Sequence, residues 1–290
     1  TDVVSGMHFD SEDLLILDNT SFGLPGGRME MEGSLDLGNK DKVPLDARLE
    51  GRADIAVLDL ILDTEDLKLE GGPFQINASL AGDLLRPNGI LRNSSSSLIM
   101  RDIQATYVPE QIVFPVTELA LELKKDHAEL KALTLHVGEN DDVTFSGDIQ
   151  NLSSLLFEGF NQPVSSELHI TSEKMIWEDY LRIFSANQPE KSVSASKDPQ
   201  EISAAERRFK ASLRDLYTTL NPRLTADIKE FRHRDLQAFH DLTTAISFKD
   251  GQTLRLEETR FLHNLKTEVN LHAEIDIADS PQTHMDIQLE

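Results

Sequence analysis

Cysteine is absent from this chain of 290 residues, and basic residues are scarce. The first absence excludes disulfides, thiolate metal sites and cysteine nucleophiles together. The second leaves 28 Lys and Arg against 51 Asp and Glu, a formal net charge of −23. Such an acidic surface repels phosphate backbones, so we expect no nucleic-acid partner.

Long apolar runs are also missing. No segment approaches the roughly 20 apolar residues that a transmembrane helix needs, and no signal peptide is present. The chain begins at Thr1 without methionine. We interpret it as a fragment or a mature form whose membrane anchor could lie outside this sequence. Glycine-rich nucleotide loops are absent too, and we expect no cofactor.

The dominant pattern that is present is alternation of apolar and polar residues with period two. It recurs in 29–37, 74–80, 119–123, 133–137, 143–149 and 269–277. Each run predicts a strand with one apolar and one wet face. Short charged connectors, such as 124–127 and 249–252, predict hairpin turns. The predicted fold class is therefore mainly β, a curved antiparallel meander or groove built from repeated hairpin units.

Residues 185–222 interrupt the alternation. A polar, serine-rich loop is predicted over 185–198, followed by an amphipathic helix over about 199–220. Short capping helices are expected at 56–62, 151–160 and 174–184. The predicted organisation is thus three parts: repeated antiparallel β units with short helices (1–184), a loop plus helix insertion (185–222), and a C-terminal β unit continuing the same sheet (223–290).

Two stretches share an order of elements. In 98–152 and 224–279, a strand, a polar linker, a strand, a charged turn and two more strands follow one another. Asp102 aligns with Asp227 at an offset of 125, and Ile149 aligns with Ile275 at an offset of 126. Internal repetition of β units favours a solenoid-like or groove-like sheet.

The sequence resembles the AsmA-like family of bacterial envelope proteins, which is related to TamB and to the bridge-like lipid transfer proteins. The resemblance rests on the order of four phrases, which are "SFGLPGGRMEMEGSLDLGN" (21–39), "VTFSGDIQNLSSLL" (143–156), "PVSSELHITSEKMIWEDYLRIF" (163–184) and "RLTADIKEFRHRDLQAFHDLTTAISFKDGQTLRLEETRF" (223–261). It implies the periplasm or cell envelope of a Gram-negative bacterium, an anchor outside this chain, and a curved sheet whose concave apolar face suits acyl chains. Residues 185–222 depart from the family pattern.

An apolar strand face must be covered by a second sheet, by helices or by lipid, and alternation alone fits all three. Our first hypothesis is a non-enzymatic module that binds or conducts phospholipid acyl chains along a groove and supports outer-membrane assembly. The residues expected to line the groove lie on the inward parity of the last strands: Val269, Leu271, Ile275 and Ile277. The alternatives are a closed β-sandwich or solenoid for adhesion or scaffolding, and a carbohydrate-active β-fold enzyme.

Three other patterns have the residue types of a chemical site. The window 230–242, "EFRHRDLQAFHDL", contains His233 and His240, but no H-E-x-x-H motif occurs anywhere in the chain. We interpret both histidines as the wet side of a connecting turn, to which Leu236 and Phe239 contribute the apolar packing. The acidic segment 138–148 fits no calcium-loop pattern, and no Ser-His-Asp order or nucleophile motif is recognisable. We therefore predict no metal site and no catalytic residue.

Overall fold

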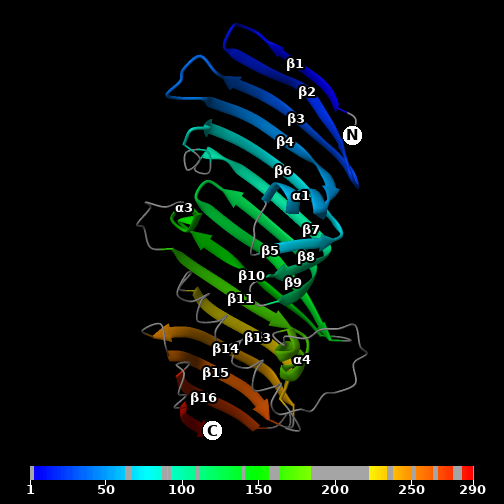
Figure 1. Cartoon of the computed structure of the whole chain (residues 1–290). Coiled ribbons are helices and arrows are strands. Elements are labelled where there is room, and N and C mark those ends of the chain that lie inside the picture. The colour runs from blue at the N-terminus through cyan, green and yellow to red at the C-terminus, as the bar shows by residue number, and fades with distance from the viewer. Residues whose placement is uncertain are drawn as a thin grey trace. The chain divides into compact units, whose positions relative to one another are not determined.

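A computed structural model of the chain describes most of its residues (Figure 1). The described ranges are 3–62, 67–86, 90, 93–108, 111–138, 141–156, 164–183, 222–233, 238–249, 253–263, 267–276 and 283–289. The loop expected at 185–198, the helix expected at 199–220, Leu236, Ile277 and the turn residues 250–252 lie outside these ranges. The three-part division of the chain therefore stays a prediction.

Strands account for most of the described residues, and helices are few and short. The elements up to residue 107 are β1 (Val3–Phe9), β2 (Leu14–Leu24), β3 (Gly27–Asp36), β4 (Pro44–Asp54), α1 (Ile55–Leu62), β5 (Leu67–Gly71), β6 (Pro73–Asp83) and β7 (Ser95–Tyr107). The elements from residue 112 to 183 are β8 (Ile112–Lys124), β9 (His127–Gly138), β10 (Asp141–Gln150), α3 (Leu152–Leu156), β11 (Ser165–Ser172), β12 (Met175–Ile176) and α4 (Trp177–Ile183). The remaining strands are β13 (Pro222–Arg232), β14 (Phe239–Lys249), β15 (Thr253–His263), β16 (Thr267–Asp276) and β17 (Thr283–Leu289).

These strands form one large, open, mostly antiparallel sheet, which confirms the predicted fold class at that level. The chain divides into two compact units. Unit 1 comprises 1–105, 116–133 and 148–164, and unit 2 comprises 106–115, 134–147 and 165–290. In unit 1, antiparallel pairing joins β1 to β2, β2 to β3, β3 to β4, β4 to β6 and β6 to β7. In unit 2 it joins β13 through β17 in sequence order.

One junction in unit 2 corrects the prediction of an antiparallel meander. Strand β11 pairs with β13 in parallel, from Ser166 opposite Pro222 to Ser172 opposite Ile228, and β12 extends the parallel pairing along β13. Parallel neighbours need a crossover connection, whereas antiparallel neighbours can be joined by a hairpin. Residues 173–221 supply that long connection. Sequence alternation missed it because alternation is the same for both strand directions.

Strand β4 illustrates why these segments form strands. Along it Ala47 and Ala53 are buried, while Arg48, Glu50 and Arg52 between them are exposed. A pleated strand directs successive side chains to opposite faces, so the period-two pattern separates apolar from charged atoms only in this conformation.

Three β-bulges preserve that separation where strict alternation would fail. Asn19 in β2, Asp241 in β14 and Glu258 in β15 each have a positive φ of 45–50°, and the strand register shifts at each. A bulge inserts one residue and lets the side chains beyond it return to the same face. Thr20 and Thr259, which directly follow two of the bulges, are consequently buried.

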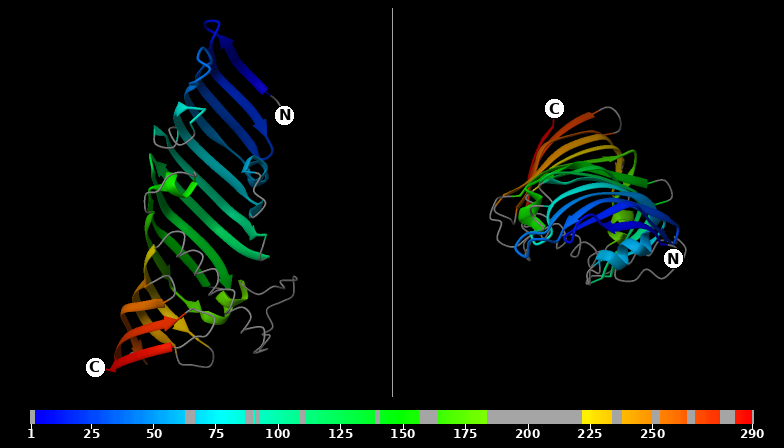
Figure 2. Two further views of the ribbon diagram at one scale, coloured as in Figure 1. Left: turned by 60° about the vertical axis from the view of Figure 1, so that its left-hand side comes forward. Right: turned by 90° about the horizontal axis from the view of Figure 1, so that it is seen from above.

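Helix α1 is anchored on unit 1 at its first residue and near its middle. The backbone N–H of Ile55 donates to Gly72 at 3.0 Å, and the Asp59 side chain accepts from the Leu69 N–H at 2.7 Å. In Figure 2 the strands of unit 1 form arcs, and α1 lies on their inner side near one end. The Ile55 side chain is fully buried there. Because α1 lies near one end of the strands, it covers only that end of the inner face.

We predict that Ile55→Ala destabilises the protein by about 2–5 kcal/mol, because it removes buried methyl groups and leaves a cavity. Urea unfolding followed by circular dichroism measures the change. Leu85→Ala is the matched control, since Leu85 is 55% exposed and its truncation should change stability by less than about 0.5 kcal/mol. Equal effects of the two variants would contradict the assigned packing of α1.

Candidate functional site

One face of unit 1 is lined by apolar side chains from successive strands. We call it the apolar face of unit 1, and its large members with described side chains include Met7, Phe9, Leu15, Leu17, Phe22, Leu24, Met29, Met31, Leu35, Leu45, Leu49, Phe74, Ile76, Leu80, Leu98 and Met100. The strand registers place these residues in cross-strand rows. One row runs from Phe9 to Leu15, Leu35 and Leu45. Opposite residues in such rows are close enough to contact one another, so the face is continuous across the strands.

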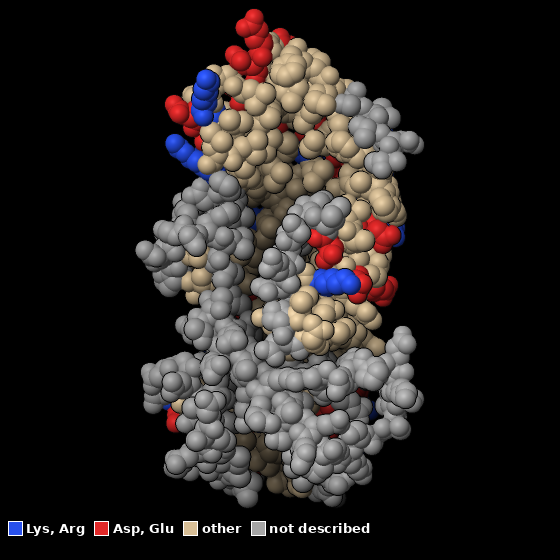
Figure 3. All heavy atoms as spheres, in the orientation of Figure 1, with Lys and Arg blue, Asp and Glu red and all other residues tan. Residues whose placement is uncertain are grey.

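The apolar face of unit 1 is only partly covered. Leu17, Leu35, Leu49 and Ile76 are half-buried despite having a strand on each side. Phe9, on β1, is 59% exposed. Figure 3 shows this part of the molecule hollowed and mostly uncharged, with acidic and basic side chains along its edges. Such an exposed apolar surface is typical of interaction sites.

Small residues contribute to the hollow. Gly33, in the row between Leu17 and Ala47, has a φ of +155°. A Cβ atom there would overlap the backbone carbonyl oxygen of Asp46 on the neighbouring strand. Only glycine fits this approach. Neither Gly33 nor Ala47 projects far above the sheet, so the neighbouring leucines border a depression.

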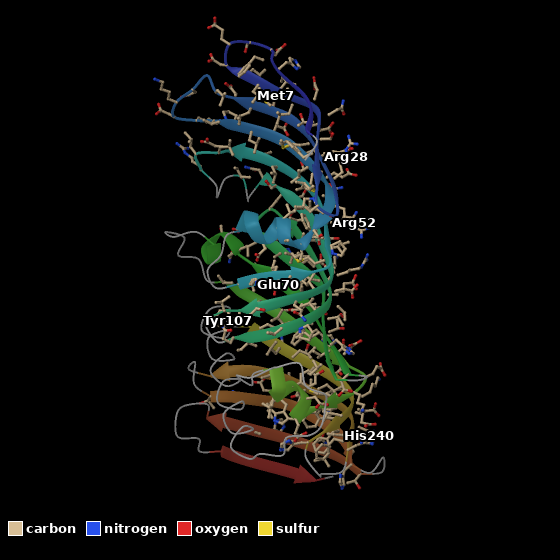
Figure 4. All side chains as sticks on the ribbon, turned by 45° about the vertical axis from the view of Figure 1, so that its right-hand side comes forward. Met7, Arg28, Arg52, Glu70, Tyr107 and His240 are labelled. Atoms are coloured by element: carbon tan, nitrogen blue, oxygen red, sulfur yellow. The ribbon has the colours of Figure 1, made fainter. Side chains whose placement is uncertain are left out.

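The opposite face of the same strands is charged. Arg28 lies 3.3 Å from Glu30, and Arg48 lies 3.4 Å from Glu50, as pairs two residues apart on one strand. All four side chains are more than half exposed, so each pair contributes little to stability. Figure 4 shows Arg28 and Arg52 on the outer side of the ribbon, where charged tips are concentrated. The two faces of unit 1 therefore differ sharply in polarity.

In unit 2, β16 carries the residues predicted to line a groove. Val269 is opposite Phe261, Leu271 is opposite Thr259, and Ile275 is opposite Leu254, which places all three on one face. Val269 is 7% exposed and Leu271 is half-buried. The side chain of Ile275 and the whole of Ile277 lie outside the described part. Val269 is thus largely packed already, and whether these residues contact lipid stays a prediction.

Aromatic rings extend the packing beside Val269. The ring of Phe261 contacts Phe239 edge to face at 4.7 Å between centroids, and Phe239 stacks on Phe231 at 6.3 Å. The packing expected of Phe239 is therefore observed. The sequence pattern does not distinguish Phe231 and Phe261 from other bulky apolar residues within predicted strands.

The two histidines of the 230–242 window have different surroundings. His233 Nδ1 lies 3.0 Å from Glu178 on α4, and both side chains are partly buried. His240 is opposite Glu230 across β13 and β14. Within the described ranges, no group of three or more His, Cys, Asp or Glu could hold a metal ion. His233 therefore belongs to the contact between α4 and the strands. It is less exposed to solvent than the prediction of a solvated turn required.

A buried polar cluster that the sequence did not reveal lies below α4 in unit 2. Asp141, at the start of β10, has a side chain only 2% exposed, and Lys174 Nζ lies 3.7 Å from its Oδ1. The Ser172 hydroxyl donates to the carbonyl oxygens of Asp142 and Lys174 at 2.9 and 2.7 Å. Burial raises the pKa of the Tyr180 hydroxyl well above its usual range, and the carboxylates of Asp141 and Asp142 add to that rise. The Tyr180 hydroxyl of α4 therefore lies close to this cluster.

A second buried carboxylate organises the rim of unit 1. Asp83 Oδ1, at the end of β6, accepts hydrogen bonds from the backbone N–H groups of Val43 at 2.9 Å and Leu85 at 3.1 Å. The hydrogen bond from Val43 is the main reason why the pKa of Asp83 falls below its usual value. Asp83 thereby fixes the approach of the chain to β4, whose first residues border the apolar face of unit 1.

No family model, curated protein or solved structure matches the chain. Among the helices of the described ranges, none has the length and apolar character needed to cross a membrane.

Tyr180 gives a prediction for alkaline pH. Because its pKa is higher in the folded state, the unfolded hydroxyl ionises first, and folding stability falls as the pH rises above about 10. We expect the wild type to lose more stability than Tyr180→Phe between about pH 8 and about pH 11. Urea unfolding at both pH values tests this, and equal losses in the two proteins would contradict the buried setting of Tyr180.

Proposed function

We propose that this protein is a non-enzymatic lipid-binding module that holds or conducts acyl chains along the apolar face of its sheet. The observation that carries the proposal is the apolar face of unit 1. Its rows continue across five or more strands from β1 to β7, yet residues such as Leu17, Leu49 and Ile76 keep part of their surface exposed.

The chemistry of this face suits an acyl chain. Each methylene group removed from water contributes roughly 0.8 kcal/mol, and no directional partner is needed. Phospholipid head groups would stay at the strand ends, where the lysines Lys40 and Lys42 are exposed and could meet a phosphate. Ligand sites of this kind are concave, mostly apolar and bordered by a few polar groups.

Sequence order supports an AsmA-like assignment, with a place in the periplasm or envelope of a Gram-negative bacterium and a role in outer-membrane assembly. The two sequence stretches that resemble each other contain strands at matching offsets. Strands β9 and β15 begin 126 residues apart, at His127 and Thr253, and β10 and β16 also begin 126 apart, at Asp141 and Thr267. This spacing favours a repeated β unit.

The alternative of a closed β-sandwich for adhesion or scaffolding finds less support. A sandwich needs a second sheet to cover the apolar face. The described strands instead belong to a single open sheet, and within unit 1 helix α1 covers only one end of the inner face (Figure 2).

The proposal is tested with the purified protein and a fluorescent fatty acid. Leu49→Lys places a charge on the apolar face of unit 1 and should weaken binding by about tenfold or more, because an acyl chain would have to desolvate an ammonium group. Lipid extraction and mass spectrometry of the wild type purified from cells should in addition recover bound phospholipid.

Glu50→Gln is the matched control. It changes the net charge by the same +1, one residue away, but on the exposed charged face, so binding should be unchanged. Circular dichroism and the melting temperature establish that both variants are folded. Absence of lipid from the wild type together with equal fatty-acid binding by both variants would refute the proposal.

A further inference from the structure

Strand β1 forms an edge of the sheet in unit 1. It pairs antiparallel with β2, from Val3 opposite Phe22 to Phe9 opposite Leu15. On its other side no strand of the described ranges has a register with it, and Figure 1 shows β1 as the outermost ribbon of this unit. An edge strand presents backbone donors and acceptors that can pair with another strand.

The backbone direction at the end of β1 is fixed by one hydrogen bond. The N–H of Asp10 donates to the carbonyl oxygen of Leu14 at 3.0 Å and therefore points toward β2. Because backbone groups alternate in direction along a strand, the N–H and C=O of the preceding residue, Phe9, point away from β2. Phe9 thus offers a donor and an acceptor at the outer edge.

Two described side chains of β1 are unusual for the edge of a sheet. Met7 is 54% exposed and Phe9 is 59% exposed, and both continue rows whose next members, Leu17 and Leu15, are half-buried. Edge strands are commonly protected by lysine, proline or a covering segment. The strand sequence VVSGMHF contains no lysine, arginine or proline, so another strand could add apolar residues to the same rows.

The acidic charge near this edge indicates which kind of strand could pair with β1. Asp10, Glu12 and Asp13 in the turn after β1 and Asp18 on β2 are all exposed, and acidic side chains gather at this end of the surface in Figure 3. A second copy of the chain would bring another net charge of −23 and would be repelled. A basic strand would be attracted.

We propose that β1 is a docking edge for an extended segment of a partner protein, in which apolar residues alternate with lysine or arginine. The segment adds one strand to unit 1 through main-chain hydrogen bonds that include those of Phe9. Its apolar residues continue the rows of the apolar face, and its basic residues meet the acidic turn. This mode of recognition uses the backbone for affinity and alternate side chains for specificity.

The test uses the whole protein and a fluorescent synthetic peptide, Lys-Val-Lys-Val-Lys-Val-Lys. Phe9→Pro removes the outward N–H without removing a hydrogen bond to β2, whereas Phe9→Ala removes only the ring. Fluorescence anisotropy should give a dissociation constant about tenfold or more higher for Phe9→Pro than for Phe9→Ala. Equal binding by the two variants would overturn the proposal.

Two further measurements separate strand pairing from attraction by charge and from binding elsewhere on the protein. Lys-Val-Lys-Pro-Lys-Val-Lys, with almost the same composition and an equal charge, cannot pair as a strand and should bind more weakly. Binding as tight as that of the first peptide would mean attraction by charge alone. Hydrogen exchange of the wild type should slow in residues 3–9 when the first peptide is added. Protection confined to other residues would overturn the proposal, because the peptide would then bind at another site. A concentration-dependent dimer that Phe9→Pro abolishes would also overturn it, because the edge would then pair with a second copy of the chain.

Discussion

The constraint on which this structure depends is the need to cover one apolar side of a pleated strand. Strand pairing satisfies the backbone groups, but it leaves every second side chain on the same face. In unit 1 that face is bordered by α1 at one end and is otherwise incompletely covered, so Leu17, Leu49 and Ile76 remain half-buried. A protein in water keeps such a surface when something else occupies it, which links the architecture directly to the proposed lipid binding.

Charge has a separate role in the same strands. The ion pairs of Arg28 with Glu30 and of Arg48 with Glu50 are exposed and contribute little to stability. They keep the outer face solvated and make the two faces of each strand differ in polarity. This difference fixes the strand register, because a shift of one residue would exchange apolar side chains with charged ones. The buried carboxylates act differently. Asp83 fixes a strand end by accepting a backbone hydrogen bond from Val43, and Asp141 lies beside the ammonium group of Lys174.

Much of the fold was accessible from the sequence, because alternation is a local property. The strands around Phe74 and Val269 and the short helices near Ile55 and Trp177 were predicted close to their observed positions. The parallel pairing of β11 with β13 and the bulge at Asn19 were not. The prediction relied on the alternation of apolar and polar residues. This alternation is the same for parallel and antiparallel strands, and a single inserted residue hardly alters it.

The sequence by itself determined which side chains share a face, since the period of two follows from backbone geometry alone. Only the tertiary structure decided how well each of them is covered. Val269 and Leu35 have the same alternating context, yet Val269 packs beside Phe261 and is 7% exposed, while Leu35 stays half-buried. Coverage depends on contacts between different elements, such as α1 over unit 1 and the rings of Phe231, Phe239 and Phe261 in unit 2, and no local pattern encodes those contacts.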